Sequence, residues 1–318
     1  MKISYYDLIG SPPDVAQVFN NRELGLAIWI FIFVICIIAN KNLYEPALDV
    51  VRIVFCCKFI VIYICMLLYS TIMVYFLFRL GFWDLSLLKK TIMWFFFTAI
   101  ISAFRAIGKA KDFSYFKTVL KDYIKITILL EFLINTYTFS LIGELILIPV
   151  LFIITSFNTV LDKSPEFQNE KSEPVKKLFW GINILLSLYI IINAFSMALT
   201  DLENLGTISN LKKMFLSPIL SILFLGFIYA FALWASYEEI FVRIGFGETK
   251  SKSLIRYIKL RIITICCINL RKVNSFWRIC GLKIMGISNK ADAVEILNIC
   301  EQLMLKIDSA PDGVEEIP

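Results

Sequence analysis

The chain has 318 residues, of which 58% are hydrophobic and only 18% are charged, and its formal net charge is +6. Soluble domains average about 45–50% apolar and about 25% charged residues, so this composition excludes an ordinary soluble protein. The sequence contains no histidine, which excludes a Ser-His-Asp hydrolase and an H-E-x-x-H zinc protease. We therefore predict an integral membrane protein that is not an enzyme and holds no metal or cofactor.

Apolar runs long enough to approach a membrane crossing recur in the first 236 residues. A helix needs roughly 17–25 mostly apolar residues to cross a bilayer. Residues 1–23 precede the first run and have neither the basic start nor the cleavage site of a signal peptide, so we expect them to stay as an extracytoplasmic segment. The runs that are read without difficulty cover residues 24–39, 55–78, 91–104, 140–160, 178–199 and 215–236.

The stretch 124–139 is the difficult part of this membrane domain, which we place at residues 24–236. Lysine and arginine concentrate on cytoplasmic loops, and their distribution can decide whether the stretch crosses. If 124–139 crosses, 25 of the 32 Lys and Arg residues lie inside and 7 lie outside. The sequence therefore predicts an all-α polytopic membrane protein with about seven transmembrane helices, an outer N-terminus and a cytosolic C-terminus. Six helices with a re-entrant segment at 124–139 remain the alternative.

Two glutamates, Glu131 and Glu144, lie inside the apolar stretch 124–160. An ionised side chain near the bilayer centre costs at least about 2.5–3.5 kcal/mol, so both need a reason to be there. Asn135 lies four residues after Glu131 and shares its helical face. One reading is that Glu131, Asn135 and Glu144 line a water-filled ion path within a 124–160 hairpin. The other reading is that both acids lie near the headgroups, bonded to the polar hinge or paired with a lysine.

Residues 237–310 are more polar and predict a small cytosolic domain, α+β or all-α, followed by a disordered tail at 311–318. In the stretch IRYIKLRIITICCINLRKV the apolar residues alternate, among them Ile258, Leu260 and Ile262. Period two with β-branched residues favours a strand, and a buried helix is the alternative. Further on, an apolar periodicity beginning near residue 290 indicates an amphipathic helix.

Basic residues gather in this domain, interleaved with aromatic ones. They are Arg256, Lys259, Arg261, Arg271, Lys272 and Arg278. Three kinds of partner fit such a set: anionic lipid headgroups, a nucleotide or oligonucleotide bound by phosphate pairing and base stacking, and a cytosolic signalling protein.

This layout of several crossings, no catalytic signature and a basic cytosolic domain resembles the compact membrane effectors of bacterial antiviral defence systems. The resemblance covers the whole chain, is one of architecture, and carries over no residue. It implies a homo-oligomeric, channel-like or membrane-permeabilising effector in the bacterial inner membrane, gated through its cytosolic domain. A secondary transporter and a membrane scaffold that recruits a cytosolic partner are the alternatives.

Overall fold

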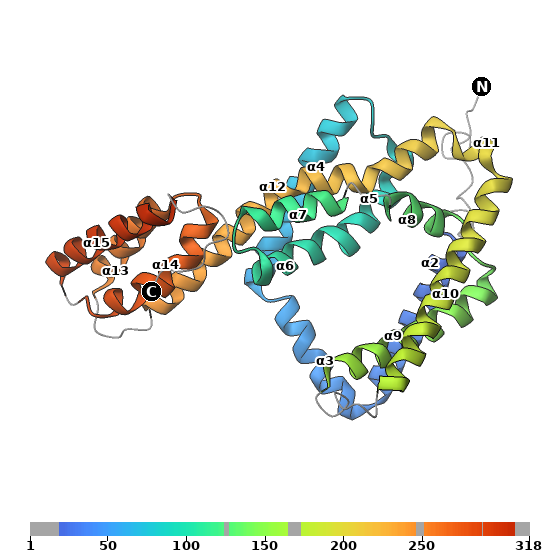
Figure 1. Ribbon diagram of the computed structural model, residues 1–318, viewed down its shortest axis with the longest axis horizontal. Coiled ribbons are helices and arrows are strands. Elements are labelled where there is room, and N and C mark those ends of the chain that lie inside the picture. The colour runs from blue at the N-terminus through green and yellow to red at the C-terminus, as the bar shows by residue number, and fades with distance from the viewer. Residues whose placement is uncertain (1–18, 124–126, 165–172, 246–250, 288, 309–318) are drawn as a thin grey trace, which may run out of the picture. The chain divides into compact units, whose positions relative to one another are not determined.

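The computed structural model describes residues 19–123, 127–164, 173–245, 251–287 and 289–308, and within these ranges the regular structure is helical throughout (Figure 1). Residues 1–18 of the predicted N-terminal segment 1–23, residues 124–126 of the stretch 124–139, and the predicted tail 311–318 lie outside the described residues. Six stretches of helix are long and apolar enough to cross a membrane. They are α2 (Asn21–Ala39), α4 (Cys57–Arg79), the combined stretch Leu85–Lys109, α9 (Leu141–Lys163), α10 (Glu173–Thr200) and most of α12 (Ile208–Gly245).

Shorter helices complete the described chain. The stretch Leu85–Lys109 is built from η2 (Leu85–Leu87), α5 (Leu88–Trp94), the π-helical turn η3 (Phe95–Ala99) and α6 (Ile100–Lys109). The others in the membrane region are α3 (Lys41–Val54), α7 (Phe113–Tyr123), α8 (Thr127–Thr136) and α11 (Leu202–Leu205). The apolar run predicted at 91–104 is therefore part of a longer helical stretch, Leu85–Lys109. A helix satisfies its backbone N–H and C=O groups internally, which favours continuing it through a membrane.

The chain folds as two compact units, the first from residues 1–63 and 126–214 and the second from residues 64–125 and 215–318. In the first unit, α2 packs against α9, and α10 packs against both α9 and α8. Asn21, at the beginning of α2, contacts Phe139 just before α9, and Gly25, one turn later in α2, lies against Ile148 within α9. Residue numbers therefore increase in the same direction along both helices. The helices α2 and α9 are therefore parallel, and their N-terminal ends lie at the same end of this unit.

In the second unit, α12 packs along the stretch α5–α6. The indole Nε1 of Trp94 donates to Ser221 Oγ at 2.8 Å, and the rings of Phe104 and Phe231 meet edge to face at 5.9 Å. Contacts again advance in the same direction on both elements, so α5–α6 and α12 are parallel. Gly226 lets the hydroxyl of Tyr69 on α4 come within 3.0 Å of where a Cβ would be. This contact confirms the close packing that small residues favour between membrane helices.

The C-terminal bundle consists of the end of α12 together with α13 (Lys252–Cys266), α14 (Leu270–Met285) and α15 (Lys290–Asp308). Its core joins Ile240 and Ile244 of α12 to apolar residues of the other three helices, including Phe276 and Leu297. The helix α12 has 38 residues and is about 57 Å long at 1.5 Å per residue. One continuous helix is therefore shared by the membrane region of this unit and the C-terminal bundle.

The strand predicted within the C-terminal domain is wrong, because this segment forms α13. Ile258, Ile262 and Ile265 are buried at helical spacing, whereas Leu260 is 58% exposed on the opposite side. The alternating pattern would have placed Leu260 on the same face as Ile258 and Ile262. The helix is favoured because it brings all three isoleucines to one face, where they pack in the four-helix core. A strand would place Ile265 on the face opposite Ile258 and Ile262.

Candidate functional site

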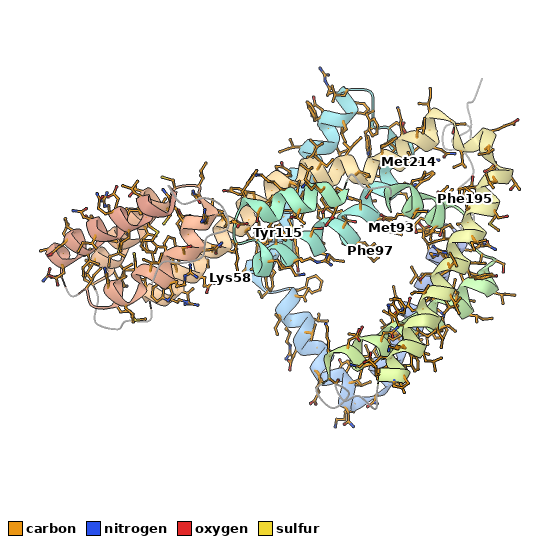
Figure 2. All side chains as sticks on the ribbon, viewed as in Figure 1. Lys58, Met93, Phe97, Tyr115, Phe195 and Met214 are labelled. Atoms are coloured by element: carbon orange, nitrogen blue, oxygen red, sulfur yellow. The ribbon has the colours of Figure 1, made fainter. Side chains whose placement is uncertain are left out.

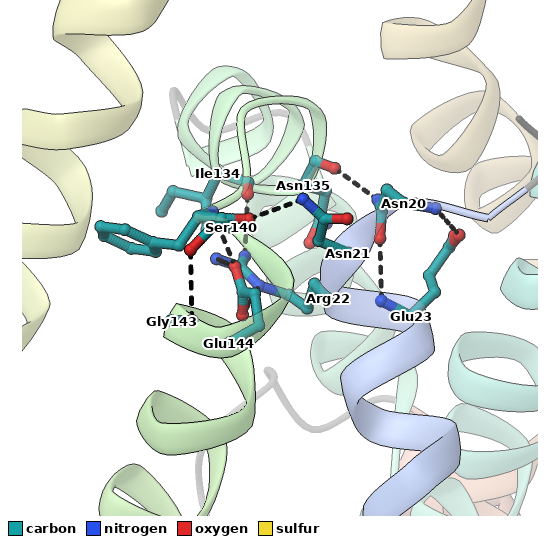
Figure 3. Close-up of polar contacts among 10 residues, drawn as sticks. Asn20, Asn21, Arg22, Glu23, Ile134, Asn135, Ser140, Gly143 and Glu144 are labelled. Atoms are coloured by element: carbon teal, nitrogen blue, oxygen red, sulfur yellow. Dashed lines mark hydrogen bonds and ion pairs between the residues drawn. The ribbon is translucent and has the colours of Figure 1, made fainter. Parts of the chain in front are cut away.

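The most buried charged group in the described part of the chain is Glu144, whose side chain is 1% exposed at the beginning of α9. Its two carboxylate oxygens accept hydrogen bonds from Arg22 of α2, Oε2 from Nε at 3.1 Å and Oε1 from Nη2 at 3.0 Å (Figure 3). The backbone N–H of Phe139 adds a third bond to Oε1 at 3.1 Å. Such a bidentate, charge-assisted arrangement is among the strongest polar contacts that proteins make.

The guanidinium group of Arg22 is also held from a third direction. Its Nη1 donates to the carbonyl oxygen of Ile134, two residues before the end of α8, at 2.8 Å. The Arg22 side chain is 18% exposed, so water reaches part of it. Arg22 therefore connects the beginning of α2, the end of α8 and the beginning of α9 in one buried polar contact.

Two asparagines beside Arg22 satisfy the backbone where α8 ends and α9 begins. The amide of Asn20 donates to the carbonyl of Asn135 at 2.9 Å, and the amide of Asn21 donates to the carbonyl of Phe139 at 2.9 Å (Figure 3). Asn20 also forms a capping box with Glu23, which satisfies backbone donors at the N-terminus of α2. The last carbonyls of a helix lack intrahelical partners, and Asn20 supplies one for Asn135 near the end of α8, while Asn21 bonds a carbonyl of the connection to α9.

Close approach of α2 and α9 holds this polar contact in place. A Cβ at Gly25 would lie 3.0 Å from Ile148 Cδ1 and 3.4 Å from Glu144 Cβ. One turn further along α2, the Trp29 indole donates to the carbonyl of Leu145 at 2.9 Å. Glycine at position 25 thus allows the close approach of α2 and α9 near the point where the Arg22 side chain reaches Glu144.

The three residues predicted to line an ion path have different surroundings. Glu131 and Asn135 are exposed on α8, and Asn135 contributes its backbone carbonyl to the contact with Asn20. Glu144 is instead paired, which agrees with the reading that places an acid at the polar hinge, although its partner is an arginine and not a lysine. The structure therefore separates Glu144, held in an ion pair, from Glu131, whose side chain is open to its surroundings.

Sequence reasoning missed Arg22, because it counted this residue only among the outer charges. The signal available was an arginine at the head of an apolar run, within a polar stretch N-N-R-E. Its partner lies 122 positions away in the chain, and no local pattern identifies a pairing over that distance.

A second polar contact joins the C-terminal bundle to the membrane helices of its own unit. The amide of Asn274 on α14 donates to the carbonyl of Lys111 at 2.9 Å, and its Oδ1 accepts from Ser236 Oγ of α12 at 2.9 Å. On the same side of α12, the hydroxyl of Tyr229 donates to the carbonyl of Ile268, between α13 and α14, at 2.6 Å. The bundle is thus bonded both to α12 and to the connection between α6 and α7.

The six basic residues predicted as ligand or partner contacts do not share one environment. Arg256 and Arg278 are exposed, whereas Lys272 is buried. The Nη2 of Arg261 pairs with Glu301 at 3.1 Å, and the ammonium of Lys259 lies 5.0 Å from the centroid of the Phe241 ring. Arg271, also predicted, is half-buried. Several of these cations therefore make contacts within the bundle.

Within the described residues, no group of three or more Cys, Asp or Glu side chains is arranged to hold a metal ion. No protein-family model matches the chain, and no curated protein or solved structure shows significant similarity to it.

Proposed function

We propose that this chain is a channel-like integral membrane effector whose conducting state is controlled through the C-terminal bundle. The observation that carries the proposal is the coupling in the second unit. The helix α12 runs from the contacts of Trp94 and Phe104 into the core of the bundle, and Asn274 bonds the bundle to the end of the α5–α6 stretch. A ligand or partner that displaces the bundle would therefore also strain the packing of these membrane helices.

We also infer seven crossings, with an outer N-terminus and a cytosolic C-terminus. If the parallel helices α2 and α9 both cross, an odd number of crossings separates them, and α4 with Leu85–Lys109 supplies only two. The second unit supports the same count independently. Its parallel elements α5–α6 and α12 are separated by α9 and α10, again an even number. Both arguments require one further crossing between Lys109 and Ser140.

The described helices in that interval are α7 of the second unit and α8 of the first, and α8 lies within the predicted crossing 124–139. Exposed charges occur on both: Lys117 and Lys121 on α7, and Glu131 on α8. Charged side chains inside a membrane generally face a water-filled cavity or one another. The stretch that contains α8 is therefore our proposed contribution to an ion path, with Glu131 and Asn135 exposed on it.

Topology can be tested with single cysteines introduced at Lys111 or Gly206 in a chain whose native cysteines have been replaced. Intact cells are then treated with a membrane-impermeant maleimide. Seven crossings place these positions on opposite sides, so only the cysteine at 206 should react. Labelling of both would favour six crossings with a re-entrant segment.

Function is tested by recording currents from the purified full chain in planar bilayers. We expect Glu131→Gln to change single-channel conductance or ion selectivity, because this carboxylate would face the path. Asn274→Ala should change the open probability and leave the conductance unchanged, because it acts on coupling. Asn298→Ala is the matched control, since Asn298 accepts from Arg261 within the bundle. A native chain that shows no current across a range of pH and added nucleotides would remove the proposal.

From the architectural resemblance alone, we further propose a homo-oligomer in a bacterial inner membrane that acts in antiviral defence. A scaffold is the second candidate, and the paired state of Glu144 favours it, because a saturated carboxylate holds helices together and does not meet ions. Under that alternative, Glu131→Gln would have no effect and deletion of α13–α15 would abolish recruitment of a cytosolic partner.

A further inference from the structure

The helix α3 has an unusual position between two membrane spans. It begins at Lys41, and the single residue Asn40 separates it from α2, serving as the C-cap of α2 and the N-cap of α3. It ends at Val54, and α4 begins at Cys57. When α2 and α4 cross the membrane, the end of one and the beginning of the other lie at the same surface. Both ends of α3 are then held at that surface by connections of one and two residues.

This constraint decides the direction of α3. Its 14 residues form a rod about 21 Å long. A rod of that length cannot point away from the membrane while both of its ends stay at the surface. Lys58, exposed at the beginning of α4, is a basic residue of the kind that anchors a helix at the headgroups (Figure 2). The helix α3 must therefore lie nearly parallel to the membrane plane.

The side chains of α3 divide into two faces that suit this orientation. Its four charged residues recur at helical spacing and form one stripe: Lys41, Glu45, Asp49 and Arg52. Within the stripe, Arg52 Nη1 pairs with Asp49 Oδ1 at 3.2 Å. No residue of α3 is buried, and six large apolar side chains on the remaining surface are 38% to 62% exposed: Leu43, Tyr44, Val50, Val51, Ile53 and Val54.

We propose that α3 is an in-plane membrane-surface helix whose apolar face inserts among the lipid acyl chains and whose charged stripe lies among the headgroups. Helices with this division of faces lie in the interface with the apolar side buried about 5–10 Å into it. The stripe carries two positive and two negative charges, so binding depends on the apolar face and not on anionic lipid. The inference requires only that α2 and α4 cross, and it is independent of the proposed channel function.

The first test uses the native full chain in liposomes of phosphatidylcholine that carries a diazirine in its acyl chain. After illumination and digestion, mass spectrometry locates the labelled residues. We expect label on the apolar residues of α3, with α2 as the positive control and α13 of the C-terminal bundle as the negative control. Label on α2 and none on α3 would overturn the proposal, whether α3 lies in water or is covered by protein.

The second test measures the orientation directly with nitroxide labels placed along α3, in a chain whose native cysteines have been replaced. Labels at Leu43, Val50 and Val54 should collide more with oxygen than with a water-soluble nickel complex, and labels at Glu45 and Asp49 should show the reverse. The depths at 43 and 54 should be similar. A steady change of depth from 43 to 54, or low collision with both reagents at all apolar positions, would contradict an in-plane lipid-facing helix.

Discussion

Replacing Glu144 with glutamine tests whether the Arg22–Glu144 pair stabilises the packing of α2 on α9. The glutamine has nearly the same shape but only one acceptor oxygen, so it cannot accept from Nε, Nη2 and the Phe139 N–H together. Breaking a buried ion pair by removing one partner costs about 3–5 kcal/mol. Arg22 keeps its bond to Ile134 and is 18% exposed, so we expect the lower end of that range, about 3 kcal/mol.

The assay is thermal unfolding of the purified chain in one detergent. At about 2–4 °C per kcal/mol, the change should lower the midpoint by about 6–12 °C. Glu131→Gln is the matched control, and because Glu131 is exposed its effect should stay within about 0.5 kcal/mol. The double variant with Arg22→Gln should lose less than the sum of the single losses, since it leaves no unpaired charge. An unchanged midpoint with a reduced current would refute this reasoning and return Glu144 to the ion path.

Two further predictions concern packing and thiol reactivity. Gly25→Leu should destabilise the chain by about 1–3 kcal/mol, because the leucine side chain would meet α9. Gly181→Leu is the control and should not destabilise it, since a Cβ there meets nothing within 4 Å. Thermal midpoints of the two variants are compared. Burial raises the pKa of the Cys266 thiol to about 12, so this thiol stays protonated at neutral pH. Mass spectrometry after native alkylation should find the exposed Cys267 modified and its neighbour Cys266 unmodified until unfolding.

The sequence predicted the location of the six helices that are long and apolar enough to cross a membrane, because this depends on a local property, the length of an apolar run. It also located Glu131 and Glu144 as unusual acids. It did not separate their environments, since Glu144 is neutralised by a residue 122 positions earlier. The seventh crossing remains a prediction, which the parallel pairs in each unit support.

In the C-terminal domain the sequence was less informative. Ile258, Leu260 and Ile262 alternate as in a strand, and Ile258, Ile262 and Ile265 also fit one face of a helix. When a segment satisfies both periods, the surrounding core decides between them. Here the end of α12, α14 and α15 offer a helical groove, and Leu260 is left exposed.

By itself, the sequence determined that this chain enters a membrane and roughly where, because the transfer of apolar side chains from water is additive along a local stretch. Only the tertiary structure decided which charges are paired, which helices run parallel, and that α12 is shared by the membrane region and the bundle of its unit. Those properties depend on contacts between residues that are distant in the chain, and their energies are set by distance and burial in three dimensions.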